Sequence, residues 1–199
     1  IGSGLVGSEM CIRDRDRAAP VGSSGKPQTR GIHEYHSKSI TLFDTEGYEV
    51  ESSSTPENSA FYKNIIDLID ERKNNYPADL GMHIHEVWYC INNRFMDIDE
   101  KLIKDIQARN IPVCVIITKV DNLDENEVAQ IKDAVGDAGK RNRINGVEVF
   151  TYSTNSDLGD EYVQKSEINS WAHHNLDDYL RESSVSYTHL RAHETGAYL

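Results

Sequence analysis

Three polar residues at the end of an apolar run are the clearest candidates for chemistry in this sequence. The run 112–117 (PVCVII) is followed by Thr118, Lys119 and Asp121. The carboxylate of Asp121 offers two acceptor oxygens side by side, which match the two adjacent N–H donors on the pairing edge of guanine. Lys119 can lay its stem along the base and the ribose. The pattern therefore favours selective binding of a guanine nucleotide, because a wrong base would leave polar groups unpaired. A solvated turn after a strand is the alternative.

Polar residues also follow two other apolar runs. Asp44 and Gly47 lie in the segment DTEG, and Ser153 and Thr154 follow the run 147–152. Ligands of open parallel sheets bind beyond the carboxyl ends of the strands, so these residues are expected near one another. Asp44 could hold Mg2+ through water, while Gly47 could let a backbone N–H approach a terminal phosphate. A chance turn after a strand is the alternative for this segment.

The elements that must position these residues alternate along the chain. Strands are predicted at 39–44, 84–91, 112–117 and 147–152. The third of them is apolar on both faces, as an interior strand must be. Between the strands, apolar residues recur at helical spacing, and Thr55–Pro56 and Asp97 could start helices. We therefore expect a three-layer α/β sandwich with a mostly parallel sheet. A last helix is expected at about 161–182. The apolar residues with which the three earlier helices face the core are Phe61, Ile65, Leu68 and Ile69, then Ile98, Leu102 and Ile106, then Val128, Ile131 and Val135.

The order of these motifs resembles that of the Era-like branch of the translation-factor-related bacterial P-loop GTPases (TRAFAC class). The resemblance spans residues 21–182. It implies a G domain of the P-loop NTPase type that binds GTP or GDP with Mg2+. In this family, a Pro-x-Thr switch loop binds Mg2+ and senses the terminal phosphate. The segment GKPQT matches that loop, so the resemblance gives Thr29 both the metal and the catalytic role.

The same resemblance assigns the remaining candidate residues. Asp44 corresponds to the aspartate that holds Mg2+, and Gly47 corresponds to the glycine of the second switch. Residues 118–121 (TKVD) match the base-specificity motif, which implies nucleotide-binding roles for Thr118, Lys119 and Asp121. Ser153 and Thr154 stand where the family usually has Ser-Ala, whose backbone contacts the guanine oxygen.

The sequence departs from the family at two positions. No GxxxxGK[ST] phosphate loop is readable, since GSSGKP at 22–27 has a proline after Lys26 and does not follow a strand. Tyr48 follows Gly47 where switch GTPases have a water-orienting glutamine, which predicts slow turnover unless a protein effector or a homodimer through the switch region assists. The expected activity is GTP hydrolysis to GDP and phosphate in the complete parent protein. A GTP-responsive binding module with negligible hydrolysis, and a receiver-like scaffold without nucleotide, are the alternatives.

The two ends of the chain share an inverted coding relationship. Residues 8–14 (SEMCIRD) and 185–191 (VSYTHLR) can be encoded by one DNA segment read in opposite directions, and the pairing extends from Ile1 with Tyr198 to Arg15 with Ser184. Both peptides resemble translated adapters of transposase-based sequencing libraries. We therefore expect 1–15 and 184–199 to be adapter-derived, and 16–183 to be a partial GTPase domain.

The resemblance also predicts an incomplete sheet. In the family, the strand that precedes the phosphate loop lies between the strands represented here by 39–44 and 84–91. A gap or a makeshift neighbour is therefore expected between these two segments, and GTP binding is expected to be weak.

Composition excludes several classes of function. The chain has 21 Lys and Arg against 33 Asp and Glu, a net charge of -12, which disfavours binding of nucleic acid through a basic face.

Cys90 and Cys114 lie in apolar runs and are predicted to be buried free thiols of a cytoplasmic protein. No apolar run approaches the length of a membrane span, about 18 residues. Finally, His33, His36, His83 and His85 favour surface histidines over a zinc site, and Asp67, Asp70 and Glu71 are expected on a solvated helix face.

Overall fold

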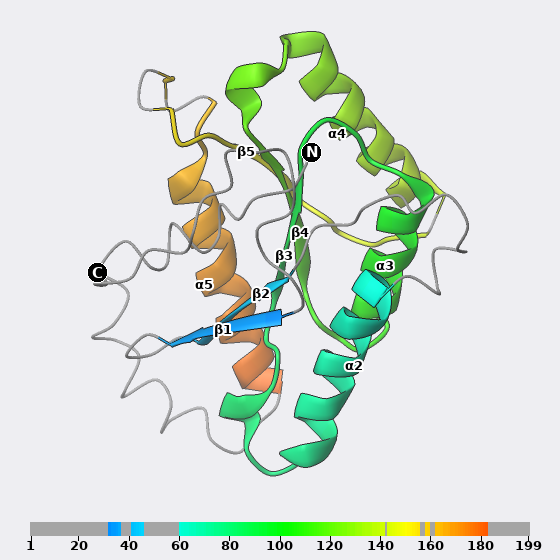
Figure 1. The fold of residues 1–199 in the computed structure, drawn as a ribbon, viewed down its shortest axis with the longest axis vertical. Helices are drawn as coiled ribbons and strands as arrows, with labels where there is room; N and C mark the ends of the chain where they lie inside the picture. Colours follow the sequence, from blue (N-terminus) through cyan, green and yellow to red (C-terminus); the bar gives the residue numbers. More distant parts are fainter. Residues whose placement is uncertain are drawn as a thin grey trace.

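The chain folds as an α/β structure whose larger sheet is parallel. The computed structural model describes residues 32–36, 41–45, 60–141, 143–155, 158–159 and 162–182. Within these residues, helices pack on both faces of a three-stranded sheet, and a separate β-hairpin lies beside it (Figure 1). The α/β class and the parallel pairing predicted from the sequence are thus confirmed for this sheet.

The parallel sheet has the strand order β3-β4-β5. Its strands are β3 (Val87–Ile91), β4 (Val113–Thr118) and β5 (Val149–Tyr152). Strand β4 is buried along its whole length, because it has a strand on each side and helices on both faces. The predictions at 112–117 and 147–152 hold to within two residues. The prediction at 84–91 starts too early, because residues 84–86 precede the paired region.

The β-hairpin consists of β1 (Ile32–His36) and β2 (Thr41–Thr45), which pair antiparallel. Strand β2 matches the predicted strand 39–44, whereas β1 was not predicted. In the described part of the chain, β2 and β3 are not hydrogen-bonded neighbours, and the strands form two sheets. The expected gap or makeshift neighbour between the segments 39–44 and 84–91 stays a prediction.

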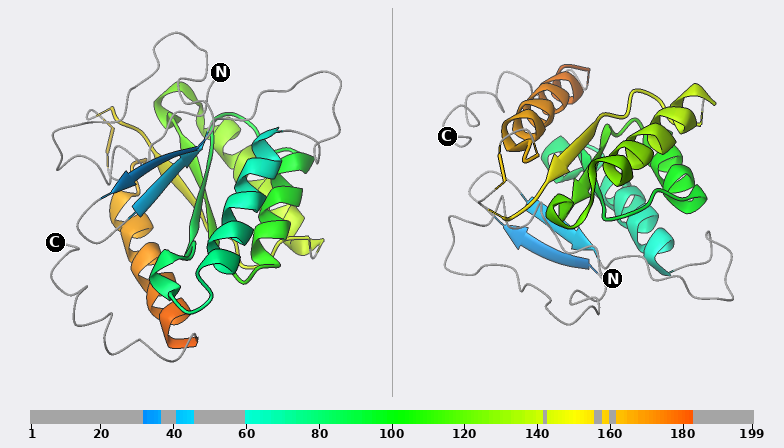
Figure 2. Two further views of the ribbon diagram at one scale, coloured as in Figure 1. Left: turned by 60° about the horizontal axis from the view of Figure 1, so that its bottom comes forward. Right: turned by 90° about the horizontal axis from the view of Figure 1, so that it is seen from above.

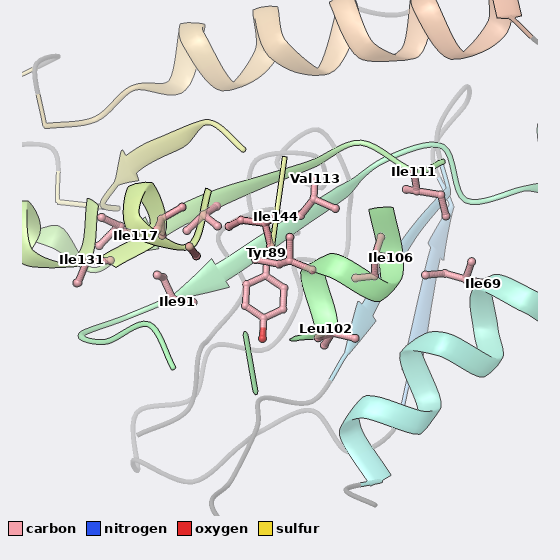
Figure 3. Packing of buried hydrophobic residues seen from close by; sticks show 14 residues of the cluster. Ile69, Tyr89, Ile91, Leu102, Ile106, Ile111, Val113, Ile117, Ile131 and Ile144 are labelled. Carbon is pink, nitrogen blue, oxygen red and sulfur yellow. The ribbon is translucent and has the colours of Figure 1, made fainter. Parts of the chain in front are cut away.

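Helices cover the two faces of the parallel sheet unequally (Figure 2). The helices α2 (Ala60–Asn75), α3 (Asp97–Gln107) and α4 (Glu125–Lys140) contribute to one apolar cluster, and α5 (Lys165–Glu182) contributes to the other. Successive side chains of β4 alternate between the clusters, as the period of a strand requires. The larger cluster includes Tyr89, Ile91, Leu102, Ile106, Val113, Ile117 and Ile131 (Figure 3), and the smaller one Cys114, Ile116, Phe150, Tyr152, Ile168 and Trp171.

Side chains close the first turns of α3 and α4. Asp124 accepts a hydrogen bond from the Glu127 amide at 2.8 Å, and the Glu127 carboxylate accepts one from the Asp124 amide at 2.8 Å. This reciprocal pair is a capping box. At α3, the carboxylate of Asp99 accepts from the Met96 amide at 2.6 Å. The prediction that Asp97 caps α3 is wrong, because Asp97 is already the first helical residue.

Other features of the described residues bear on the sequence predictions. Cys114 is buried and Cys90 is half-buried, and both are free thiols. Burial raises the pKa of Cys114 well above its ordinary value. Helix α5 begins at Lys165 rather than near residue 161, and Thr55–Pro56 lies outside the described residues. Within the part of the chain that the structure covers, no helix has the length and apolar character that crossing a membrane requires.

Candidate functional site

Two neighbouring parallel strands deliver the candidate residues to one edge of the sheet. Thr118 is the last residue of β4 and lies in register with Tyr152, the last residue of β5. Lys119 and Ser153 therefore both lie directly beyond this edge. Asp121 follows in the short 3-10 helix η3 (Val120–Asn122). The segments 118–121 and 153–154 therefore meet at this edge.

Thr118 holds the end of β4 in place. Its side chain is fully buried, at 0% exposure, and its hydroxyl donates a hydrogen bond of 3.0 Å to the carbonyl of Ile91 at the end of β3. A buried hydroxyl with a satisfied donor has little left to offer a ligand. In this structure Thr118 therefore fixes the strand end that carries Lys119, and its nucleotide-binding role stays a prediction.

Lys119 adopts a left-handed backbone conformation, with φ 55° and ψ 40°. This region costs a residue with a side chain about 1 kcal/mol or more, so it persists only where the surrounding structure enforces it. Here the turn lets the Asn122 amide donate to the Lys119 carbonyl at 3.0 Å, which starts η3. The turn sends the chain away from the sheet and brings Asp121 above the end of β5.

Asp121 is an exposed carboxylate whose orientation is set by a buried serine. The hydroxyl of Ser153 donates a hydrogen bond to the Asp121 carboxylate, and the amide of Asn155 donates to the same hydroxyl oxygen at 3.0 Å. Ser153 is buried while Asp121 is exposed. The result is a short relay in which the backbone positions a hydroxyl and the hydroxyl positions a carboxylate. Thr154 is exposed beside this relay.

The side-chain role of Ser153 was missed by sequence reasoning, which assigned this residue only a backbone contact. A signal was present in the sequence, since a hydroxyl residue follows one parallel strand directly and an acid lies just beyond the neighbouring strand. In parallel strands with a shared register, such positions meet across the sheet edge.

The two loops beyond β4 and β5 are joined a second time. The hydroxyl of Tyr162, which precedes α5, donates to the carboxylate of Glu125 at the start of α4, at 3.3 Å. Together with the contact between Ser153 and Asp121, this bond links the β4-α4 loop to the β5-α5 loop. The edge is thus built from two loops that support each other, which limits the movement of Asp121.

Asp44 lies in the other sheet. It pairs with His33 across the β-hairpin and is only 2% exposed. A carboxylate oxygen is the kind of ligand that Mg2+ prefers. Thr29 and Gly47, the other residues predicted to act at the phosphates, lie outside the described residues. Among the residues that the structure describes, no group of three or more His, Cys, Asp or Glu side chains could hold a metal ion.

The histidines are distributed over separate elements. His36 lies on β1, where its Nδ1 is 3.2 Å from the hydroxyl oxygen of Thr41. His83 Nε2 lies 2.8 Å from the carbonyl oxygen of Tyr76, at the turn after α2. His83 and His85 both precede β3, which begins only at Val87.

The residues at the ends of β4 and β5 can hold a planar polar group against the edge of the sheet. The carboxylate of Asp121 can accept from two neighbouring donors, and Lys119 lies between it and the strand end. In comparisons with known sequences, no protein-family model and no curated protein matches this chain.

Proposed function

We propose that this chain is the guanine-recognising part of an Era-like GTPase domain of the P-loop type, which binds GTP or GDP with Mg2+. The observation that carries the proposal is the contact between Asp121 and Ser153 at the carboxyl ends of two parallel strands. Ligands of parallel α/β sheets bind at this edge. The three-stranded parallel sheet with helices on both faces is compatible with such a domain.

The choice of base follows from the hydrogen-bonding capacity of the carboxylate. Guanine carries a ring N–H beside an amino group, so both of its donors can meet the two oxygens of Asp121. Adenine lacks the ring N–H at the equivalent position. Its binding would leave the carboxylate desolvated without partners, a loss that selects against it. The bond from Ser153 strengthens the selection, because an oriented carboxylate loses less entropy when the base arrives.

The phosphate end of the ligand is assigned to Asp44, Thr29 and Gly47. When bound, Mg2+ would supply positive charge that offsets the negative charge developing on the phosphates during hydrolysis. The carboxylate of Asp44 and the hydroxyl of Thr29 are of the oxygen type that suits this ion. The backbone at Gly47 would present an N–H to the terminal phosphate. Hydrolysis to GDP and phosphate is proposed only for a parent protein that also carries a phosphate-binding loop.

A GTP-responsive binding module is the second candidate. It is favoured by Tyr48, which replaces the residue that orients the attacking water in switch GTPases. In that case the base site would still select guanine, while an effector or a second copy of the chain would bind only to the form of the chain that carries GTP. Single-turnover cleavage of GTP by the complete parent protein separates the two candidates, since the module predicts no acceleration over the reaction in water.

Guanine selectivity can be tested directly on the chain by titrating it with GDP and with ADP. Protein-observed NMR is suitable because it measures weak binding at millimolar nucleotide. We expect GDP to bind at least about tenfold more tightly than ADP, with the largest shifts in the amides of residues 119–122 and 153–155.

Asp133 provides a matched control for the acidic residue, because it is exposed on α4. The variant Asp133→Asn should keep the preference for GDP, whereas Asp121→Ala should lose it. Equal affinity of the unmodified chain for the two nucleotides, or shifts centred away from these residues, would contradict the proposal.

A further inference from the structure

Arg72 joins the β-hairpin to helix α2. Its guanidinium donates to the carboxylate of Glu34 on β1 at 2.9 Å, and it lies over the ring of Phe43 on β2, 4.6 Å from the ring centroid. Tyr76 contributes a second ring at 5.9 Å. The side chain of Arg72 is only 16% exposed, against 38% for Glu34. Ion pairs and cation-π contacts are stronger when they are shielded from water, so this contact exceeds an ordinary surface ion pair.

The two hairpin residues held by Arg72 are direct partners. Glu34 and Phe43 are paired across the hairpin, so their side chains share one face. The next pair along the strands is His33 with Asp44. Arg72 therefore contacts the hairpin one residue away from Asp44. A change in the position of Arg72 would move this part of the hairpin and Asp44 with it.

Other residues of α2 fix the helix to the rest of the fold. The guanidinium of Arg109 donates two hydrogen bonds of 2.7 Å to the carboxylate of Asp70, and the hydroxyl of Tyr62 donates to the carboxylate of Asp105 on α3. Asp70 was expected on a solvated face, yet it is engaged in this bidentate pair. Ile69 packs into the larger apolar cluster (Figure 3). Helix α2 thus contacts both the core and the hairpin.

We propose that Arg72 is a positioning residue that couples helix α2 to the hairpin and so determines where Asp44 lies. The consequence for Mg2+ rests on the proposed function, whereas the mechanical coupling does not. Arginine suits the role because its planar fork can stack on a ring while it donates to a carboxylate. Lysine would keep the charge but lose the stacked contact.

The coupling can be tested by amide hydrogen exchange of the chain without nucleotide. The variants are Arg72→Met, Arg72→Lys, Glu34→Gln and the double variant Arg72→Met with Glu34→Gln. We expect Arg72→Met to raise exchange of the hairpin amides in 32–36 and 41–45 about tenfold, and Arg72→Lys to restore part of the protection. The double variant should exceed Arg72→Met only slightly, because both changes remove the same contact.

Two controls separate coupling from a general loss of stability. Lys73 is exposed on the same helix, so Lys73→Met should leave hairpin exchange unchanged. The amides of β4 serve as an internal reference and should keep their protection in every variant. Unchanged hairpin exchange in Arg72→Met, equal loss of protection in β4, or additive effects in the double variant would overturn the proposal. None of these outcomes depends on nucleotide binding, so they are distinguishable from failure of the proposed function.

Discussion

At the scale of single residues, the exposed carboxylate of Asp121 derives its direction from a buried neighbour. Sequence alone indicated the chemistry of Asp121 and Lys119, because a carboxylate and a lysine at a strand end are readable as types and spacing. It could not indicate that the Ser153 hydroxyl turns toward Asp121, since that contact depends on the register of β4 with β5. Nor could it indicate that the Thr118 hydroxyl is used internally, on the carbonyl of Ile91.

Loss of the Ser153 hydroxyl should weaken selection without removing it. In Ser153→Ala, the Asp121 carboxylate keeps its charge and loses its orienting donor, which is worth about 1 kcal/mol. We expect the preference for GDP over ADP to fall about fivefold, as measured by NMR titration. Ser166→Ala, at an exposed serine near the start of α5, is the control. An unchanged preference in Ser153→Ala would show that the relay does not orient the acid.

Glu86 is a second residue whose surroundings determine its behaviour. It precedes β3, accepts from the Trp88 indole N–H at 2.9 Å, and has a second carboxylate oxygen that is buried without a partner among the described residues. Burial raises the pKa of Glu86 to about 7. The carboxyl group is therefore neutral in the folded chain below that pH, while in the unfolded chain it ionises near its ordinary pKa of 4.5.

This difference predicts how stability depends on pH. The contribution of the neutral Glu86 carboxyl group to the free energy of unfolding is fully present below about pH 4.5. It is lost as pH rises through about 7, because the unfolded chain then releases a proton that the folded chain retains. The loss of stability amounts to about 3 kcal/mol at most. Urea unfolding should show that Glu86→Gln, which cannot ionise, removes this decline and is more stable than the unmodified chain at pH 8. A decline of equal size in Glu86→Gln would refute this assignment, and Glu71→Gln, at an exposed position on α2, serves as the control.

At the scale of elements, β5 is an edge strand whose outer side is covered by a glutamine. The backbone amide of Thr151 donates to the side-chain carbonyl of Gln164 at 3.0 Å, and the backbone amide of Gln164 donates to the backbone carbonyl of Thr151 at 3.0 Å. Gln164 therefore continues the hydrogen-bonding pattern of the sheet by one residue. Covering an edge in this way protects the strand from pairing with another chain.

Truncation of Gln164 should expose the Thr151 amide. We expect Gln164→Ala to lower the free energy of unfolding by about 1–2 kcal/mol, because a buried donor loses its acceptor. Gln164→Glu keeps an acceptor oxygen at the same place and should retain most of the stability. Chemical denaturation followed by circular dichroism measures both, and an equal loss in the two variants would show that the hydrogen bond to the side chain is unimportant.

The elements themselves were predictable to different extents. Strand β4 was evident because a continuous apolar run bounded by polar residues is typical of an interior strand. Strand β1 escaped prediction because IHEYH is largely polar and exposed, so its strand conformation depends on pairing with β2 rather than on its own pattern. The beginning of β3 was placed too early for a related reason, since residues 84–86 alternate like a strand but precede the register of β3 with β4, which starts at Val87.

At the scale of the whole molecule, the described strands form two sheets, and helix α2 contacts both the hairpin and the core. The candidate base site lies on the three-stranded sheet, while Asp44 lies on the hairpin. A nucleotide that contacts both would have to bridge two units that share no strand pairing. This arrangement makes the position of the hairpin relative to α2 important for any ligand that carries phosphate, and it explains why binding by this chain is expected to be weak.

The most direct measurement of the central claim is the nucleotide preference of Asp121→Asn. An asparagine amide donates where the carboxylate accepted, so it should meet the oxygen that xanthine carries in place of the guanine amino group. We predict that NMR titration of this variant will show tighter binding of XDP than of GDP, a reversal of the order in the unmodified chain. If the variant keeps the original order, the carboxylate of Asp121 does not select the base, and the account of this site is wrong.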